Sequence, residues 1–157
     1  MTNSVCRVAV GSDHGGFERK EHIVAWLKAR GYQVCDFGCH DAETGYDYPD
    51  IAFPVAESVA DGRFDRAILV CTTGIGMCIA ANKVRGIRCS LCADAYAAEM
   101  TRRHNDANVL ALSAHSLSDE QTDRIVETWF ATQFEGDRPG QERHKRRIAK
   151  IAAYEKG

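Results

Sequence analysis

Short apolar runs alternate with stretches of helical spacing along the whole chain, and this alternation limits what the chain can fold into. Runs typical of strands cover residues 5–10, 33–37, 67–71, 87–92 and 107–112. Helical patterns cover residues 17–30, 49–60, 77–84, 94–103, 119–132 and 142–155. Strands that alternate with helices pair in parallel, and the helices cover both faces. The sequence therefore predicts an α/β fold, a three-layer αβα sandwich around a five-stranded, mainly parallel sheet.

Size and charge limit the class of protein. A chain of 157 residues closes one hydrophobic core without splitting, so we expect a single domain over residues 1–157. The formal net charge of -2 gives no electrostatic reason to expect nucleic acid or a membrane surface as partner. No signal sequence or membrane span is evident, and seven cysteines, an odd number, fit free thiols in a reducing compartment. We expect a cytosolic protein.

The segment LVCTTGIGMCIAANK is the strongest local signal. Its buried strand delivers Cys71 into a glycine-containing turn at the start of a helix. Backbone N–H groups of residues 72–76 would point into one pocket and favour an anion, either a phosphate or the oxyanion of an enediolate. The same field would favour the thiolate form of Cys71. Taken alone, a cysteine at a strand end is as often a small buried hydrophobe.

Three other functions of this loop each require a particular residue at a particular position. A dinucleotide loop needs a third Gly or Ala where Ile79 stands, although Asp94 lies about 20 residues on, as that fold requires. A cysteine phosphatase needs an arginine where Met77 stands. Lys83 is too far along the helix to serve a P-loop. The dinucleotide alternative is weakened but stays open.

Five residues are of the types that bind zinc, namely Cys35, Cys39, His40, Cys89 and Cys92. However, Cys89 and Cys92 fall within an extended run, where side chains three apart point to opposite faces. We therefore expect no metal site.

Two further polar clusters follow predicted elements. Asp13 and His14 lie at the carboxyl end of the first strand, where Asp13 could equally be a helix cap and His14 a solvated loop residue. His104 and Asn105 lie between a helix and a strand.

The last helix carries Arg143 and Arg147 one turn apart, so both guanidinium groups share a face suited to a dianionic phosphate. A basic run on a terminal helix is more often a solvated face, and only neighbours in a pocket would make it a site.

Five strings in order, GSDHGGF, DYPD, CTTGIGMCIAANK, RHNDANVLAL and RHKRRI, resemble the type B ribose-5-phosphate isomerase family, which includes allose- and galactose-6-phosphate isomerases. The likeness covers nearly the whole chain. It implies a Rossmann-like αβα sandwich that acts on a sugar phosphate, with no metal or organic cofactor. It also implies a homodimer or homotetramer whose pockets are each built from two chains.

The resemblance also implies roles for individual residues. Cys71 matches the base that removes a proton from carbon, and Thr73 the hydroxyl residue beside it. Asp13 and His104 match residues engaged with the sugar ring and its opening. Asn105 matches a residue beside the enediolate, His14, Arg143 and Arg147 match the phosphate end, and Tyr48 is a candidate for the pocket wall. Through their backbone N–H groups, Thr72, Gly74, Ile75 and Gly76 are the candidate substrate-binding residues of the loop.

Two positions depart from the family pattern. Thr72 stands where the family commonly has glycine, and its Cβ narrows the pocket or demands another turn geometry. His115 stands where many members have an arginine that binds phosphate. Both departures affect the choice of substrate more than the type of reaction.

The residues support two hypotheses. The first is an aldose–ketose isomerase that interconverts ribose 5-phosphate and ribulose 5-phosphate through a cis-enediolate, with a tetrose or hexose phosphate as the main variant. The second is a binding module that uses the same loop to hold a dinucleotide or a sugar phosphate without turnover.

Overall fold

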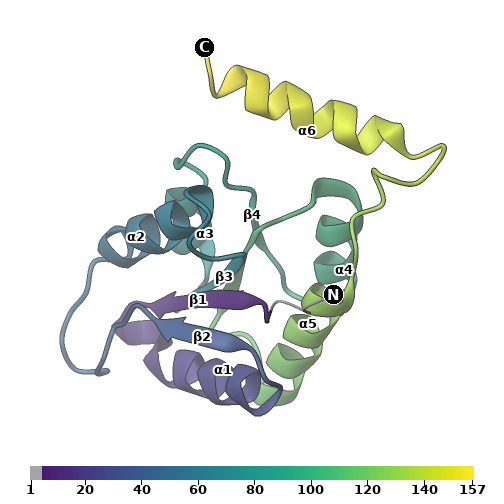
Figure 1. Ribbon diagram of the computed structural model, residues 1–157. Helices are drawn as coiled ribbons and strands as arrows, with labels where there is room; N and C mark the ends of the chain where they lie inside the picture. Colours follow the sequence, from purple (N-terminus) through teal and green to yellow (C-terminus); the bar gives the residue numbers. More distant parts are fainter. Residues whose placement is uncertain (1–4) are drawn as a thin grey trace.

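The computed structural model describes residues 5–157 and builds them around a sheet of five parallel strands (Figure 1). The strands are β1 (Arg7–Ser12), β2 (Gln33–Asp36), β3 (Arg66–Cys71), β4 (Cys89–Leu91) and β5 (Val109–Ser113). Their order across the sheet is β2-β1-β3-β5-β4, and all four neighbouring pairs are parallel. The predicted α/β class and parallel sheet are confirmed.

Helices cover both faces of this sheet. The turn η1 (His14–Gly16) leads into α1 (Phe17–Ala29), which packs with α4 (Ala95–Asn105) and α5 (Asp119–Ala131) on one face. On the other face lie α2 (Tyr48–Ala60) and α3 (Ile75–Ala81). Strand residues alternate between the two cores, as the period of two requires: Ile68 and Val70 face α1, while Leu69 and Cys71 face α2 and α3.

The side of the sheet on which the chain adds its next strand changes between β1 and β3. From β1 it moves outward to β2, and it then returns to β3 on the other side of β1. In such sheets a crevice opens at the carboxyl ends of the two strands that flank this change of side. Gly16 keeps the loop after β1 close to β3, because a Cβ there would lie 2.6 Å from the carbonyl oxygen of Val70.

Several predicted boundaries need correction. The helix predicted for residues 77–84 begins at Ile75 and ends at Ala81, because Gly74 enters it at a φ of 75° and the Asn82 side chain bonds to both backbone groups of Cys89. The strand predicted for residues 87–92 is only Cys89–Leu91. Pro54 lies inside α2.

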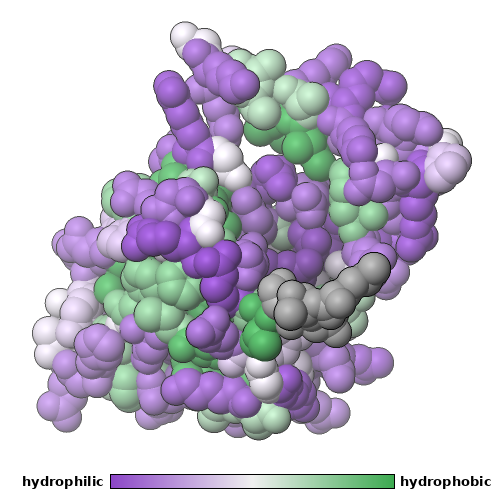
Figure 2. All heavy atoms as spheres, in the orientation of Figure 1, coloured by the Kyte–Doolittle hydropathy of each residue, from purple (hydrophilic) through white to green (hydrophobic). Residues whose placement is uncertain are grey.

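The last helix, α6 (Glu142–Tyr154), stands away from the sheet at the end of residues 132–141 (Figure 1). His144 is its one buried residue, whereas Ile151 and Tyr154 are 50% and 89% exposed. Ile148 and Ile151 line a hollow of about 340 Å³ that separates α6 from the body (Figure 2). Of the helices within residues 5–157, none has the length and apolar character to cross a membrane.

Candidate active site

Cys71 is the last residue of β3 and lies under the loop that follows it. The residue is 5% exposed, and its Sγ accepts a hydrogen bond of 3.1 Å from the backbone N–H of Gly74. Gly74 also packs against the backbone of Leu112, because a Cβ at position 74 would lie only 2.8 Å from it. A larger residue would therefore displace the loop. The sulfur therefore receives a backbone hydrogen-bond donor at the carboxyl end of β3.

The loop does not form the full ring of free donors predicted from the sequence. The N–H of Gly74 is used by Cys71, and the N–H of Ile75 donates to Thr73 Oγ1 at 3.2 Å. The expectation that all N–H groups of residues 72–76 face a ligand is therefore wrong for Gly74 and Ile75. Thr73 itself is exposed beside the buried thiol.

Tyr48 lies against the first turn of α3. A Cβ on Gly76 would meet the Tyr48 ring at 2.9 Å, so the ring and this glycine are in direct contact. The side of Tyr48 away from Gly76 is open, since the residue is 40% exposed. Tyr48 is therefore close enough to the Cys71 loop to form a wall beside it.

Asp13 lies at the end of β1, next to β3. Its backbone N–H donates to the carbonyl of Val70 at 3.3 Å. Asp13 therefore lies beside the residue that precedes Cys71 on β3. Its carboxylate accepts from the N–H of Gly16 at 3.0 Å, so Asp13 does cap the turn η1. Burial raises the pKa of this carboxyl, and the bond from Gly16 opposes that effect only in part. A carboxyl with a raised pKa suits proton transfer near neutral pH.

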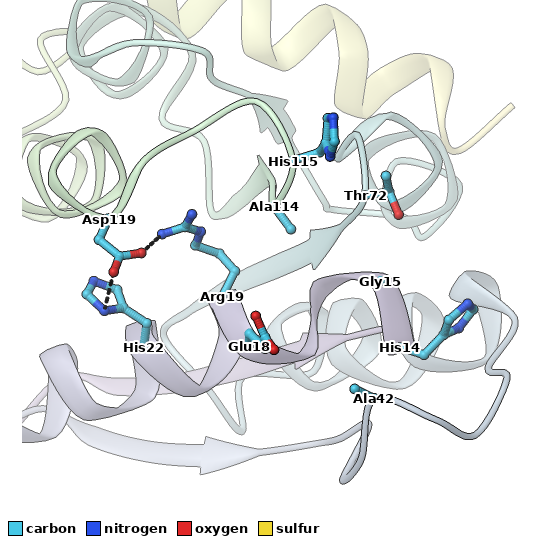
Figure 3. A pocket seen from close by; sticks show the side chains of 10 residues that line it. All are labelled: His14, Gly15, Glu18, Arg19, His22, Ala42, Thr72, Ala114, His115 and Asp119. Atoms are coloured by element: carbon cyan, nitrogen blue, oxygen red, sulfur yellow. Dashed lines mark hydrogen bonds and ion pairs between the residues drawn. The ribbon is translucent and has the colours of Figure 1, made fainter.

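His14, Thr72 and His115 line one pocket of about 420 Å³ at the carboxyl edge of the sheet (Figure 3). The N–H of His115 donates to the carbonyl of Thr72 at 3.1 Å, which joins the two loops. The Nδ1 of His14 accepts from the N–H of Tyr46 at 3.2 Å. The loops that follow β1, β3 and β5 thus meet in one pocket.

Thr72 fills space in this pocket. A Cβ on Gly15 would lie 2.3 Å from Thr72 Oγ1, so the hydroxyl rests directly over Gly15. The departure from glycine at position 72 therefore narrows the pocket, as expected from the sequence.

The sequence reasoning missed one side of the pocket, formed by Glu18, Arg19, His22 and Asp119. Arg19 pairs with Asp119 and also donates to the carbonyl of Leu117 at 2.5 Å. Residues 15, 18, 19 and 22 follow the helical spacing that marks a single face, and this signal was available in the sequence.

The other predicted residues lie at the opposite edge of the sheet. His104 and Asn105 end α4, whose carboxyl terminus lies near the start of β5, and Arg143 and Arg147 are exposed on α6. Val109 pairs with Ala67, and Ser113 pairs with Cys71. The amino and carboxyl ends of these paired strands are thus four residues apart, which is about 13 Å. Within one chain, this second group does not meet Cys71.

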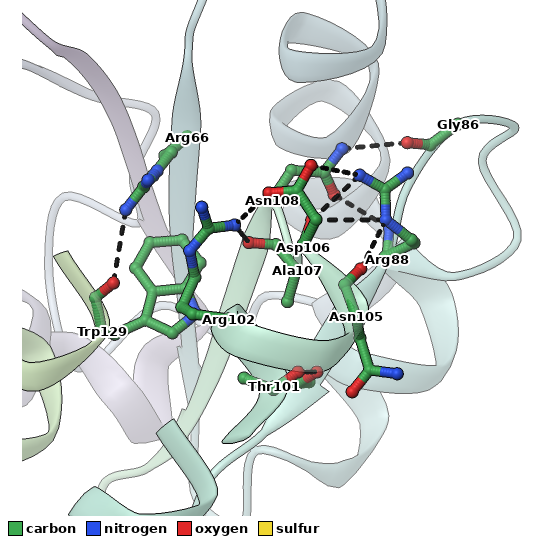
Figure 4. Close-up of polar contacts among 11 residues, drawn as sticks. Arg66, Gly86, Arg88, Thr101, Arg102, Asn105, Asp106, Ala107, Asn108 and Trp129 are labelled. Carbon is green, nitrogen blue, oxygen red and sulfur yellow. Dashed lines mark hydrogen bonds and ion pairs between the residues drawn. The ribbon is translucent and has the colours of Figure 1, made fainter. Parts of the chain in front are cut away.

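A polar network fixes the end of α4 (Figure 4). Arg102, only 5% exposed, donates to Asp106 Oδ1 at 2.8 Å and to the carbonyl of Ala107 at 2.7 Å. Arg88 donates to the carbonyl of Asn105 at 2.9 Å and to that of Asp106. Asp106 adopts a φ of 46°, which turns the chain from α4 into β5. His104 and Asn105 therefore stand on a well-anchored turn.

His104, Glu135 and His144 meet beside this turn, with one potential metal-ligand atom from each within 4.8 Å of the others. The two imidazole rings are stacked with an interplanar angle of 3°. Because a ring nitrogen binds a metal in the plane of its ring, two parallel stacked rings cannot both bind one ion without rotating. Sequence reasoning missed Glu135 and His144, and their separation of nine residues gave no spacing signal.

The alternatives raised from the sequence have structural outcomes. Cys89 belongs to the core under α2 and α3, and Cys92 to the core under α1, so the prediction that they face opposite sides is confirmed. Asp94, the dinucleotide candidate, caps α4 by accepting from the N–H of Ala97 at 2.7 Å.

The sequence matches the family model described as Ribose/Galactose Isomerase over residues 8–151. It is 44% identical over 149 residues to ribose-5-phosphate isomerase B of Escherichia coli (strain K12), covering 95% of this chain and 96% of that protein. It is 40% identical over 129 residues to D-erythrulose-4-phosphate isomerase of Pectobacterium atrosepticum, covering 82% and 85%.

Solved structures agree with these sequence matches. Ribose-5-phosphate isomerase B of Clostridium thermocellum superposes with a TM-score of 0.90 at 47% identity, covering 96% of this chain and 97% of that one. The Mycoplasma genitalium enzyme with bound ribulose-5-phosphate superposes with a TM-score of 0.88 at 40% identity, covering 96% of each. The resemblance and the Rossmann-like fold predicted from the motifs are confirmed.

Proposed function

The chain belongs to the ribose/galactose isomerase family, and we propose that it interconverts ribose 5-phosphate and ribulose 5-phosphate with Cys71 as the base. One observation carries the assignment of the base. The Cys71 sulfur lies at the carboxyl end of a central strand, with a backbone N–H 3.1 Å away and Asp13 on the neighbouring strand end.

Isomerisation of ribose 5-phosphate begins with opening of the furanose ring. In our proposal His104 gives a proton to the ring oxygen O4, while Asp13 or Thr73 takes the proton of the anomeric hydroxyl. The C1–O4 bond breaks and C1 becomes an aldehyde. The raised pKa of Asp13, caused mainly by burial, supports its part as a proton acceptor.

The proton transfer between carbons follows. The Cys71 thiolate removes the proton at C2, which leaves a cis-enediolate with its charge on O1. The proton of the O2 hydroxyl passes to O1, and the carbon-bound proton returns at C1 to give the ketose. Asn105 and the remaining donors of the loop, with Gly76 among them, would stabilise the enediolate.

The phosphate would be held by His14, His115, Arg143 and Arg147. The two arginines supply positive charge on one helix face, and their role is to orient the substrate through its non-reacting end.

A second copy of the chain would complete each site. His104 and Asn105, at the end of α4, lie about 13 Å from Cys71 along the strands of the same chain, and Arg143 and Arg147 are exposed on α6. The exposed apolar residues of α6, Ile151 and Tyr154, support an interface with another copy. We therefore propose a homodimer or homotetramer with shared active sites.

Two residues at the pocket bear on which sugar phosphate is preferred. Thr72 narrows the space over Gly15, and His115 replaces an arginine of the family pattern. Allose 6-phosphate, galactose 6-phosphate or erythrulose 4-phosphate are the variants of this proposal.

Assays with four-, five- and six-carbon sugar phosphates test the substrate. We expect the highest kcat/KM with ribose 5-phosphate; a higher value for another sugar would replace it. The non-catalytic alternative predicts calorimetric binding of NAD or a sugar phosphate without ketose formation.

We also propose three general properties of the protein. They are a single domain over residues 1–157, a cytosolic location, and a reaction without a metal or organic cofactor, nucleic acid or membrane. The seven free cysteines support a reducing compartment.

A further inference from the structure

Three segments that are distant in sequence meet around the ring of His104. His104 lies in the last turn of α4, Glu135 lies in the segment after α5, and His144 lies in the first turn of α6. The imidazole rings of His104 and His144 stack face to face, with centroids 4.4 Å apart and planes within 3°. The Oε2 of Glu135 lies 4.0 Å from the Nε2 of His104.

His144 contributes the face of its ring. The residue is 2% exposed, while Arg143 and Arg147 on the same helix are exposed. Its Nε2 is buried and has no hydrogen-bond partner among residues 5–157. A buried imidazole that leaves this nitrogen unused is placed for stacking, and the stack fixes the plane of the His104 ring.

Glu135 is held firmly by its other contacts. Its Oε1 accepts from Arg103 Nε at 2.8 Å and from Arg138 Nη1 at 3.3 Å, and its backbone N–H donates to the carbonyl of Arg103 at 3.0 Å. These bonds leave Oε2 facing His104. At 4.0 Å, beyond hydrogen-bond distance, this carboxylate oxygen acts on the Nε2 edge of the His104 ring through its charge.

The His104 side chain nevertheless stays accessible, because 38% of it is exposed. Its backbone is fixed by the turn that Arg88 and Arg102 hold after α4. An accessible imidazole with its backbone, plane and one edge all constrained is the arrangement that directed proton transfer needs.

We propose that Glu135 and His144 are positioning residues, which hold His104 in the orientation that opens a cyclic aldose phosphate. This inference rests on the proposed function, in which His104 protonates O4 as the C1–O4 bond breaks and a base takes the O1 proton. In this proposal neither positioning residue takes part in the proton transfer that Cys71 performs.

The chemistry of the two substrates separates this role from a structural one. Ribose 5-phosphate is a furanose that must open before it reacts. Ribulose 5-phosphate cannot form a furanose, because its C5 oxygen carries the phosphate, so it enters the site already open. Loss of positioning should therefore slow the reaction of the aldose and spare proton removal from the ketose.

The experiment compares two rates in the full-length protein. One is formation of ribulose 5-phosphate from ribose 5-phosphate, and the other is exchange of the C1 proton of ribulose 5-phosphate with D2O. The variants are His144→Leu, which removes the aromatic face, His144→Phe, which keeps it, and Glu135→Gln. Lys150→Ala, exposed on α6, is the matched control.

We expect His144→Leu and Glu135→Gln to lower the aldose rate by about tenfold to a hundredfold, and to change C1 exchange by less than about twofold. His144→Phe should restore most of the aldose rate. Equal loss of both rates, or no loss of either, would overturn the inference. Should His144→Leu not fold, Glu135→Gln gives the same comparison.

Failure of the proposed function has a different signature. His104→Asn, measured alongside, should lose the aldose rate selectively if His104 opens the ring. If His104→Asn affects neither rate, or wild-type protein exchanges no C1 proton, the proposed function fails rather than the positioning role.

Discussion

Asp13 shows how one residue serves both the fold and the proposed chemistry. Its carboxylate caps η1 through Gly16, and burial nevertheless raises its pKa. A carboxyl whose pKa is higher in the folded than in the unfolded state favours folding when protonated, and its ionisation opposes folding at higher pH. The charge at this position therefore costs stability where the enzyme is expected to work.

Asp13→Asn should consequently raise the free energy of unfolding at pH 7, since asparagine also caps helices well. The gain should vanish below about pH 4, the usual range of an unfolded aspartate, where Asp13 is neutral in both states. Ring opening should fall by about a hundredfold or more. Urea denaturation across pH, together with the coupled assay, measures both; a loss of stability at pH 7 would contradict the assignment.

For single residues, the sequence predicted the role of the Cys71 thiol but not the contacts around it. Cys71 was predictable because an apolar strand ends in a glycine-containing loop. The bond from the Gly74 N–H was not, because it depends on the left-handed φ of Gly74 and on its contact with Leu112. The stack of His104 on His144 depends on where α6 lies, which local patterns do not encode.

Among the elements, α1 is tied to β2 by a buried lysine. Lys20 has no exposed surface, and its Nζ donates to Glu21 Oε1 at 2.6 Å and to Asp36. Burial lowers the pKa of Lys20, but the bonds to Asp36 and Glu21 outweigh it, so the net direction is upward. This ion pair stabilises the fold below the unfolded lysine pKa of about 10.4, and the stabilisation is lost as pH rises through the folded value.

Lys20→Met should lower the free energy of unfolding by about 3–5 kcal/mol, because it leaves the Asp36 carboxylate without its partner. Adding Asp36→Asn should recover part of this loss, since the amide oxygen can still accept from the N–H of Gly38. Lys28→Met, on an exposed part of α1, is the control. Urea denaturation at pH 7 checks the series, and a loss no greater than that of the control would refute the role of the pair.

The element pattern itself was largely predictable. Strands β1, β3 and β5 are buried on both faces and therefore appear as unbroken apolar runs. The limits of α3 and β4 were not predictable, because Gly74 and the Asn82 side chain set them through contacts across the chain.

At the scale of the whole molecule, the predicted site residues divide between two edges of one sheet. The first group surrounds Cys71 at the carboxyl ends of the strands, and the second surrounds His104 near their amino ends. This division follows from the parallel sheet, because strand-to-helix loops lie at the carboxyl ends of the strands and the junction from α4 to β5 lies at their amino ends. The amphipathic pattern of α6 likewise shows which side is apolar without showing what covers it.

If each active site is shared between two subunits, two inactive variants should complement each other when their subunits are mixed. Cys71→Ala and His104→Asn should each be inactive on ribose 5-phosphate, but mixed subunits should recover about a quarter of the wild-type activity in a two-fold dimer. One site of each mixed dimer then carries both defects and the other carries none. Native mass spectrometry verifies that mixed dimers form, and mixed dimers without recovered activity would exclude a shared site.

The central claim is that Cys71 moves a proton between two carbons of a sugar phosphate. Incubation of ribose 5-phosphate with the enzyme in D2O, followed by NMR of the C2 position, measures that step directly. We predict that Cys71→Ala abolishes deuterium incorporation, whereas Cys35→Ala, which removes an exposed thiol on β2, retains it. Incorporation at the wild-type rate by Cys71→Ala would contradict the claim.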